Sequence, residues 1–461
     1  METIINVDDV SFSYGTQTEQ AVSHISLSVN KGDFIGIIGP SGAGKSTLAA
    51  CLSGAVPHHY TGTFFGSVMV DGHDTCEVSL TDVSQIVGSV LQDIDTQMVA
   101  SVVEDEMLFG LENFGVPHDQ IEQRVSETLE TVGISDLRDR EIATLSGGQK
   151  QKVAIAAILA MRPRVLVLDE PTAALDPASS TLVFETLREA NRALEITIVV
   201  VEQKVALLSE YCNRVLVLNH GEIALQGEPH EVFARTDELR TIGVDCPRVT
   251  RIFNSLETDG LVSGTPCLDV DEAERLITEI VDPDRATSDT RAPAGSPHAP
   301  SLRPHAKDAE PVLTFDHVEF SYPHGGAAVH DLNLTLYPGE LVGIVGQNGA
   351  GKTTLTKLLT GLLKPASGSV RVTGLDTASV PTSRIAREVA TLFQNPDRQI
   401  CKDTVLDEVA FGLELAGIDR AEALRRAQLV IDRFGLPADE APFSLSRGQR
   451  QMVALASVVV V

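Results

Sequence analysis

The stretch Phe34–Thr47, FIGIIGPSGAGKST, determines the fold expected for this chain. It begins with an apolar run typical of a buried strand and continues into a glycine-rich turn, and Lys45–Leu52 then has the pattern of a helix. A buried strand, a glycine-rich turn and a helix in this order predict a mixed α/β unit built around a sheet.

The same stretch occurs a second time, at Leu341–Thr354, as LVGIVGQNGAGKTT. Other segments recur in the same order: FSYG at Phe12–Gly15 becomes FSYP, and LSGGQ at Leu145–Gln149 becomes LSRGQ. Repetition over this length predicts a duplicated domain rather than a short solenoid repeat.

The repeat and the composition of the intervening chain predict four segments. Residues 1–230 form a first domain and residues 312–461 a second one. Residues 231–281 contain helical patterns and are interpreted as an extension of the first domain. Residues 282–311 are rich in Pro, Ala, Ser and Asp without periodic apolar positions, which is typical of a flexible linker.

Both copies of the decisive stretch satisfy the pattern GxxxxGK[ST] between a predicted strand and a predicted helix. Glycines let backbone N–H groups surround phosphates, the helix N-terminus favours an anion, and the lysine adds a positive charge. The hydroxyl of Ser46 or Thr353 can ligate Mg²⁺. The predicted phosphate-binding residues are Gly39, Gly42, Gly44, Lys45, Ser46 and Thr47, then Gly346, Gly349, Gly351, Lys352, Thr353 and Thr354.

Two adjacent carboxylates, Asp169 and Glu170, follow the apolar run Val165–Leu168 in the first copy. Open α/β sheets bind ligands at the carboxyl ends of their strands. We therefore expect Asp169 to hold the Mg²⁺ shell and Glu170 to orient or deprotonate the attacking water.

A second anion site is predicted at Ser146, Gly147, Gly148 and Gln149, where a small-residue turn opens a helix. Because each phosphate loop already surrounds its own phosphates, this turn is expected to serve the other copy's nucleotide. A head-to-tail pairing of the two copies would then enclose two ATP molecules.

These motifs resemble those of the ATP-binding cassette (ABC) family, over residues 1–230 and from about residue 312 to 461. The resemblance implies two tandem P-loop ABC domains of α/β class that bind ATP with Mg²⁺ and hydrolyse it. It further implies that Tyr14 and Tyr322 stack on adenine and that Gln92 and Gln394 touch Mg²⁺ and water. Asp176 resembles the loop residue that communicates between the two sites.

The chain departs from the family pattern at three places. Gln203 stands where the family usually has a histidine, and it cannot become cationic near neutral pH. The second signature keeps Ser446 and Gly448 but has Arg447 in place of a glycine. The second copy is truncated relative to the first, because the counterparts of Asp169 and Glu170 would lie beyond Val461. The predicted catalytic residues are Glu170, from its place after the apolar run, Gln92, from the resemblance, and Gln203, from its place at the histidine position.

A narrower resemblance is to the fused twin-cassette energising subunits of energy-coupling-factor (ECF) importers, based on FQNPDRQI and VEDEMLFGLENFGVP. It implies a transmembrane coupling subunit, a small substrate-capturing membrane subunit, and a peripheral location on the cytoplasmic face of the cell membrane. Vitamins, their precursors or metal ions would be imported. Glu104, Asp105 and Glu106 would lie near the groove for a coupling helix, or form a solvated charge run.

Composition limits the other functions. The chain has 36 Lys and Arg residues and 64 Asp and Glu residues, and the resulting net charge of −28 opposes broad nucleic-acid binding. No apolar stretch is long enough to span a bilayer. The scattered cysteines suit reduced thiols. The alternatives are a twin-cassette ATPase that acts on ribosomes or DNA, and a truncated nucleotide-binding fragment without turnover.

Overall fold

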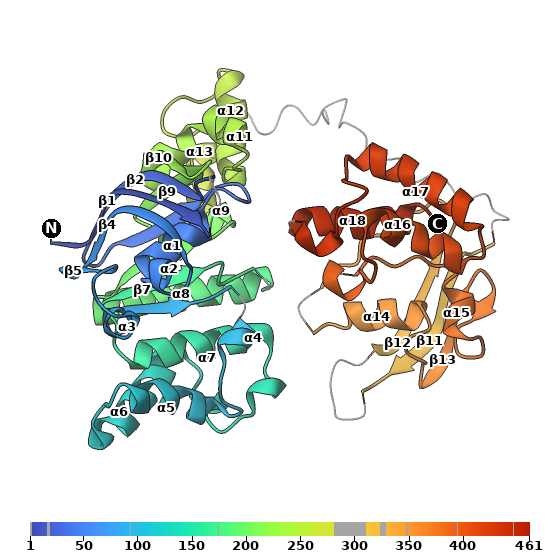
Figure 1. Cartoon of the computed structure of the whole chain (residues 1–461), viewed down its shortest axis with the longest axis horizontal. Coiled ribbons are helices and arrows are strands. Elements are labelled where there is room, and N and C mark those ends of the chain that lie inside the picture. The colour runs from blue at the N-terminus through green and yellow to red at the C-terminus, as the bar shows by residue number, and fades with distance from the viewer. Residues whose placement is uncertain are drawn as a thin grey trace. The chain divides into compact units, whose positions relative to one another are not determined.

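The computed structural model describes residues 2–15, 19–92, 94–173, 175–280, 310–322, 329–346, 349–393, 395–445 and 447–461. The chain forms two compact units, Met1–Ala294 and Gly295–Val461, here called the first and the second unit (Figure 1). Except for residues 310 and 311, the predicted linker lies outside the described residues. The boundaries drawn at residues 230 and 281 stay predictions.

The first unit is built around a six-stranded sheet in the order β10-β9-β3-β8-β7-β6. All its pairings are parallel except that of β10 with β9. The central strand carries the apolar run FIGII, and every residue of it is buried, as is typical of a parallel strand covered on both faces. The strands are β3 (Phe34–Ile38), β6 (Val87–Val90), β7 (Val165–Asp169), β8 (Thr197–Val201), β9 (Arg214–Asn219) and β10 (Glu222–Gly227).

An antiparallel four-stranded sheet, in the order β2-β1-β4-β5, packs on this core. Phe12 from β1, Leu48 and Leu52 from α1, and Ile37 from β3 share one buried apolar cluster. The phosphate-loop helix is therefore held between the two sheets. The elements are β1 (Thr3–Tyr14), β2 (Val22–Asn30), β4 (Gly62–Val70), β5 (His73–Asp74), α1 (Lys45–Leu52), α2 (Ala55–His58) and α3 (Leu80–Ile86).

Helices form the remainder of the first unit. Helices α5, α6 and α7 share a second buried cluster with α8 and α9, through residues such as Met107, Leu129, Ile155 and Phe184. In Figure 1, α5 and α6 lie at one end of this unit and α11–α13 at the other. The bounds are α4 (Ile94–Gln97), α5 (Val103–Asn113), α6 (His118–Val132), α7 (Gly147–Ala160), α8 (Pro177–Leu194) and α9 (Val205–Tyr211).

The predicted helical extension consists of α10 (Pro229–Ala234), α11 (Thr236–Ile242), α12 (Arg248–Thr258) and α13 (Val270–Ile280). Phe233 and Leu239 lie in the same buried cluster as α7 and α8. The extension is thus part of the first unit. Within the described ranges, no helix combines the length and the apolar character needed to cross a bilayer.

The second unit repeats the antiparallel sheet, in the order β12-β11-β13-β14, and the helical region. Its strands pack with α14, and α16, α17 and α18 form a separate apolar cluster. The elements are β11 (Leu313–Phe320), β12 (Val329–Leu336), β13 (Ser367–Val372), β14 (Leu375–Asp376), α14 (Lys352–Leu359), α15 (Thr382–Ile385), η3 (Pro396–Arg398), α16 (Val405–Leu415), α17 (Arg420–Phe434) and α18 (Arg447–Val459).

One sequence expectation is wrong in the second unit. The run before its phosphate loop, residues 341–346, forms no strand, and Leu341 and Val345 are exposed. Its counterpart β3 lies between β8 and β9, whereas the described part of the second unit has no equivalents of these strands. An apolar run without neighbouring strands has no partners for its backbone hydrogen bonds.

Candidate functional site

The predicted site residues of the first unit gather at one edge of the six-stranded sheet. The phosphate loop follows β3, Gln92 follows β6, Asp169 and Glu170 end β7, and Gln203 follows β8. These four strands are parallel and consecutive in the order β3-β8-β7-β6, so their carboxyl ends meet at the same edge. Residues far apart in the sequence are therefore brought together, as the sequence predicts.

The phosphate loop is closely fitted to the chain around it. Lys45 Nζ donates hydrogen bonds to the carbonyls of Gly39 (2.9 Å) and Pro40 (2.8 Å), and the side chain is buried. Burial lowers the pKa of Lys45, while Glu170 and Asp169 raise it. A Cβ at Gly44 would lie 2.3 Å from the carbonyl oxygen of Ala21, and its φ is 93°. Only glycine fits there.

Asp169 and Ser46 offer the oxygens that a divalent cation requires. Burial raises the pKa of Asp169, and a hydrogen bond from Ser46 lowers it. Among the described residues, Asp169 Oδ1 is one of few buried side-chain oxygens without a hydrogen-bond partner. An unpartnered buried carboxylate oxygen beside a hydroxyl fits Mg²⁺, which prefers oxygen ligands.

The carboxylate of Glu170 is held between two glutamines. Gln92 Nε2 donates to Oε2 at 2.8 Å, and Gln203 Nε2 donates a short hydrogen bond to Oε1. Glu170 has a φ of 48°, and its N–H is bonded to the carbonyl of Val201 at 2.9 Å. The two amides orient a carboxylate that faces solvent beside the phosphate loop.

Tyr14 lies next to the phosphate-loop helix. Its hydroxyl is 3.0 Å from Thr47 Oγ1, and its ring meets Phe12 and Tyr60 edge-on, with ring centres 4.9 and 6.0 Å away. The structure therefore joins Tyr14 and Thr47, two residues predicted to bind the nucleotide. Stacking on adenine stays a prediction.

The LSGGQ turn opens α7, as predicted. Ser146 is the N-cap: its Oγ accepts from the N–H of Gln149 at 3.3 Å, and Gln149 Oε1 accepts from the N–H of Ser146 at 2.9 Å. The reciprocal bonds fix the turn, and the backbone N–H groups of Gly147 and Gly148 belong to the first turn of the helix.

Sequence reasoning missed a buried polar network behind Gln203. Glu202 accepts hydrogen bonds from Thr172 Oγ1 (2.5 Å) and from the N–H groups of Gln203 (2.8 Å) and Lys204 (3.2 Å). Lys204 Nζ donates to the carbonyls of Thr172 and Leu175 and to Ser180 Oγ, at 2.6–3.2 Å. The sequence did offer a signal for this network, because the charged residues Glu202 and Lys204 flank Gln203 directly after an apolar strand.

Asp176, expected from the resemblance to communicate between sites, caps α8. It accepts hydrogen bonds from the N–H (3.0 Å) and the Oγ (2.9 Å) of Ser179, which lower its pKa. This cap holds Asp176, and Lys204 holds Thr172 and Leu175.

The acidic run Glu104–Glu106 does not form one solvated surface, which corrects that reading of it, whereas its place near a groove for a coupling helix stays a prediction. Glu106 is buried, and its Oε2 accepts from the N–H groups of Val99 (3.0 Å) and Ala100 (2.8 Å). Glu104 is paired with Arg138 at 2.5 Å, and only Asp105 is exposed. These residues are consecutive on a helix, so their side chains point in different directions.

The second unit repeats part of this geometry. Lys352 Nζ donates to the carbonyl of Gly346 at 2.7 Å, and Tyr322 OH is 3.3 Å from Thr354 Oγ1. Gly349 and Gly351 have φ values of 84° and 87°, as the loop of the first unit requires at Gly42 (79°) and Gly44. Thr353 follows Lys352 at the start of α14, and Gly448 is exposed near the start of α18. Gln394 and Ser446 lie outside the described residues.

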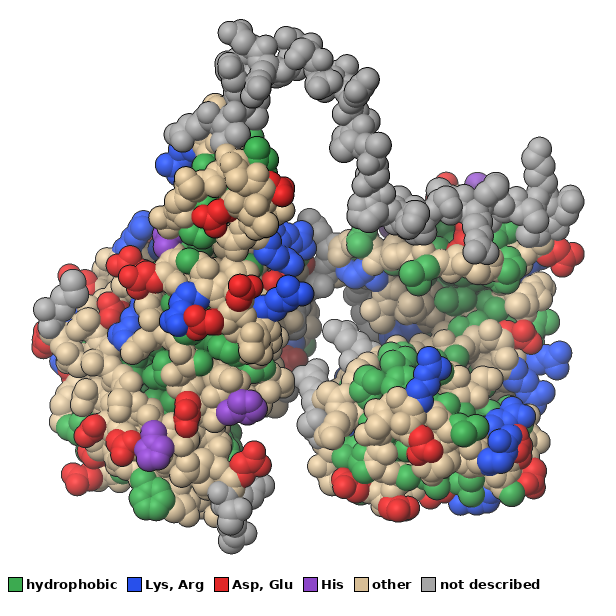
Figure 2. All heavy atoms as spheres, turned by 90° about the horizontal axis from the view of Figure 1, so that it is seen from above, with side chains coloured by type: hydrophobic (Ala, Val, Ile, Leu, Met, Phe, Trp, Pro, Cys, Tyr) green, Lys and Arg blue, Asp and Glu red, His purple; other side chains and the backbone are tan. Residues whose placement is uncertain are grey.

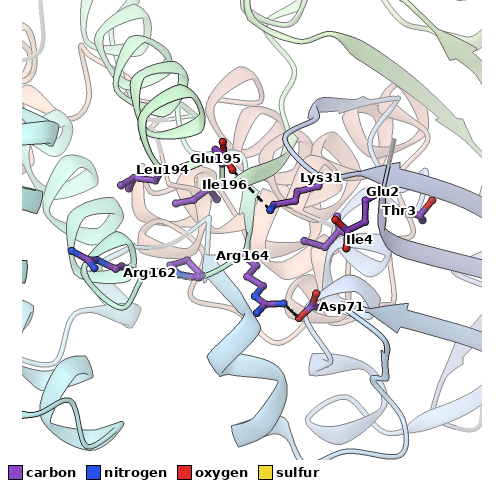
Figure 3. Close-up of a pocket in the computed structure, with 11 residues that line it drawn as sticks. Glu2, Thr3, Ile4, Lys31, Asp71, Arg162, Arg164, Leu194, Glu195 and Ile196 are labelled. Atoms are coloured by element: carbon purple, nitrogen blue, oxygen red, sulfur yellow. Dashed lines mark hydrogen bonds and ion pairs between the residues drawn. The ribbon is translucent and has the colours of Figure 1, made fainter.

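The first unit also has a pocket of about 560 Å³ at the opposite edge of the sheet (Figure 3). Lys31 and Glu195 approach to 3.9 Å across it, and Arg164 is paired with Asp71. It lies at the amino ends of the strands, away from the phosphate loop, and much of its charge is already paired. It is not the predicted nucleotide site.

Comparison with known proteins agrees with this geometry. The ABC transporter family model matches residues 22–173 and 329–461. A protein of Methanosarcina acetivorans named as an ABC transporter ATP-binding protein is 35% identical over 99% of this chain and 74% of its own. A similarly named protein of Caldanaerobacter subterraneus is 36% identical over 99% of this chain and 79% of its own.

Another relative is YkoD of Bacillus subtilis, named for HMP/thiamine import, with 32% identity over 99% of this chain and 79% of its own. The solved structure of CbiO1 from Clostridium perfringens, described as part of the ABC transporter complex CbiONQ, has a TM-score of 0.48 at 33% identity. It covers 56% of this chain and 100% of its own. The double family match confirms the duplication and the α/β P-loop fold. This chain belongs to the ABC transporter family, as one of its ATP-binding, ATP-hydrolysing proteins.

Proposed function

We propose that this chain binds Mg²⁺-ATP at the first unit's sheet edge and hydrolyses it to energise a membrane importer of the ECF type. The observation that carries the proposal is the carboxylate of Glu170, held by Gln92 and Gln203 on the sheet edge that also carries Lys45. The remaining steps follow from the contacts around it.

Each described side chain has a distinct task in this proposal. Lys45 and the backbone N–H groups of its loop bind the phosphates. Ser46 and Asp169 would hold Mg²⁺, which when bound would supply positive charge next to the phosphates. Glu170 accepts the proton of the attacking water, and the amides of Gln92 and Gln203 keep its oxygens directed toward that water. Tyr14 contacts the base.

In this proposal each unit contributes residues to both nucleotide sites. In a head-to-tail pair, the first site is completed by Ser446 and Gly448 and the second site by Ser146–Gln149. The second site has Lys352, Thr353 and Gln394, but the described second unit contains no counterpart of β7 and its carboxylates. Among the described residues, the carboxylate pair that hydrolysis requires belongs to the first site.

Two observations support membrane partners: an exposed apolar surface on the first unit and the name of the relative YkoD. Leu91 and Val99, which flank the Gln92 loop, and Phe109 on α5 are exposed apolar side chains. The N–H of Val99 is bonded to Glu106 on α5, the helix that carries Phe109, and we take the three exposed side chains as one apolar docking region. It fits an apolar helix of a transmembrane coupling subunit. The name of YkoD supports a small organic substrate such as a vitamin precursor.

Action on ribosomes or DNA is less well supported. The net charge is −28, and on the face shown in Figure 2 acidic and basic side chains of the first unit are interspersed rather than gathered by sign. Nucleic-acid binding requires a concentrated basic surface.

Two measurements test the proposal. Purified chain should release phosphate from ATP only with Mg²⁺, and affinity purification of the tagged chain from detergent extracts of its host should recover an integral membrane protein. If the wild-type chain releases no phosphate, the alternative of a nucleotide-binding fragment without turnover would be favoured. Recovery of ribosomal or DNA-repair proteins instead would contradict the importer.

A further inference from the structure

An ion pair connects the Gln92 loop to the signature helix of the first unit. Lys150 Nζ lies 2.7 Å from Asp95 Oδ1, with Lys150 21% and Asp95 70% exposed. Asp95 lies in α4, three residues after Gln92, and Lys150 directly follows Gln149 in the first turns of α7. The pair therefore joins the segment that contacts Glu170 to the turn predicted to bind the other nucleotide.

The second unit has an ion pair at the equivalent positions, although Arg450 Nε makes no hydrogen bond there, whereas Lys150 donates one to Asp95. Arg450 Nε lies 2.7 Å from Asp397 Oδ1, with Arg450 20% and Asp397 42% exposed. Asp397 belongs to η3, after the Gln394 position, and Arg450 is the fourth residue of α18, as Lys150 is of α7. The basic residue differs between the copies, but the pair is present in both.

The segment that carries Asp95 can transmit a displacement because both of its ends are held. Gln97 Oε1 accepts from the N–H of Leu91 at 2.9 Å, and Gln97 Nε2 donates to the carbonyl of Ser89 at 3.0 Å. Beyond α4, Glu106 accepts from the N–H of Val99. A movement of Gln92 would carry Asp95 with it.

The place of the cation is itself informative. A positive charge in the first turns of a helix is unfavourable, because the helix dipole is positive at that end. Lys150 and Arg450 both occupy such positions. Pairing with Asp95 or Asp397 offsets this cost.

We propose that Asp95–Lys150 and Asp397–Arg450 are positioning pairs, each of which makes the signature turn of its unit move together with the glutamine loop of the same unit. The kinetic part of this inference rests on the proposed function.

Charge reversal and its restoration test the pair. Full-length chains carrying Asp95→Lys, Lys150→Asp or both are compared with the wild type in three measurements: kcat for ATP, affinity for a non-hydrolysable ATP analogue, and the hydrogen-exchange protection of the backbone amide of residue 150, corrected for the intrinsic rate of the side chain present. That amide is bonded to the carbonyl of Ser146 at 2.9 Å, so its exchange reports the signature turn directly without nucleotide. The control is the matched reversal of Arg162 and Glu127, an exposed ion pair at 3.0 Å.

Each single reversal should lower the exchange protection of the amide of residue 150 and lower kcat by about two- to fivefold, the range that a partly exposed ion pair supports. Analogue affinity should not change, and the double reversal should return both quantities toward wild type. The Arg162–Glu127 reversals should leave them unchanged.

Unchanged exchange in both single variants would overturn the inference. So would a double variant with lower kcat than either single one, because the two residues would then act independently rather than as a pair. If exchange responds and is restored while the wild type shows no hydrolysis, the positioning pair stands and the proposed function fails.

Discussion

At the scale of single residues, the candidate site depends on Glu170. Its φ of 48° is a conformation that non-glycine residues rarely adopt, and such backbone strain is concentrated at functional sites. The strain is maintained by the N–H bond to Val201 and by the two glutamines on the carboxylate. The surroundings therefore hold one side chain in one orientation.

Glu170→Gln should remove nearly all phosphate release, because the amide cannot accept a proton from water. A positioned base typically contributes roughly 10²–10⁴-fold. ATP binding should persist, since Lys45 and its loop are intact. Phosphate release and nucleotide titration of the purified chain measure the two effects.

Glu195→Gln is the matched control, because Glu195 lies at the opposite edge of the sheet and its side chain is 80% exposed. Its turnover should equal that of the wild type. Equal turnover in Glu170→Gln would show that the base is another residue.

At the scale of elements, three strand ends meet at Glu170, and a buried network supports the loop after β8. Lys204 donates to Thr172, Leu175 and Ser180, so the loop of Gln203 and the loop before Asp176 are joined. Burial lowers the pKa of Lys204, and Glu202 and Asp176 raise it.

Lys204→Met should lower kcat by roughly tenfold with a smaller change in KM. The substitution removes the ammonium group that donates to three acceptors. Each buried acceptor left without a hydrogen bond costs about 1–3 kcal/mol of stability. Steady-state kinetics give the two constants. Lys31→Met, at an exposed lysine, is the control, and an equal effect there would exclude a specific role for the network.

Glu106→Gln should destabilise the first unit by about 1.5–3 kcal/mol, since hydrogen bonds to a charged acceptor fall in this range. The carboxylate accepts from two backbone N–H groups, and Glu408 does the same for Cys401 and Lys402, each at 2.8 Å. Denaturant unfolding measures the loss.

The internal repeat provides the comparison for this prediction. Glu408→Gln should destabilise the second unit in the same way, whereas Asp105→Asn, at an exposed position, should change little. Wild-type stability in both glutamine variants would show that these carboxylates do not hold their loops.

At the scale of the whole molecule, the two units are similar in sequence but not in the support they give the phosphate loop. The first loop follows a fully buried central strand. The second follows residues 341–346, which form no strand. A loop whose flanking chain is not held must lose more conformational entropy on binding, which weakens binding.

Nucleotide titration should therefore reveal a tighter and a weaker site. Lys45→Ala should abolish the tighter one, Lys352→Ala the weaker one, and the double variant both. Isothermal titration in the presence of Mg²⁺ gives the stoichiometry of each variant. Unchanged stoichiometry in either single variant would contradict the two-site proposal.

Sequence reasoning was most successful where one local pattern implies one local structure. The glycines, Lys45 and Ser46 had to form a strand-turn-helix loop, and Ser146 with Gln149 had to cap a helix. The duplication could be predicted because matching motifs recur in the same order. Glu170 could be named because two carboxylates follow an apolar run, and Gln92 and Gln203 could be named from the family resemblance.

Only the tertiary structure decided which of these residues touch and which helix face each residue occupies. Sheet order places the ends of β6, β7 and β8 side by side, so that two amides bind one carboxylate. Within Glu104–Glu106, the direction of each side chain around α5 buries Glu106 and exposes Asp105. The apolar run 341–346 has the sequence of a strand, but a strand forms only where neighbouring strands accept its hydrogen bonds. Local patterns determine local structure, whereas pairing depends on neighbours that are distant in the sequence.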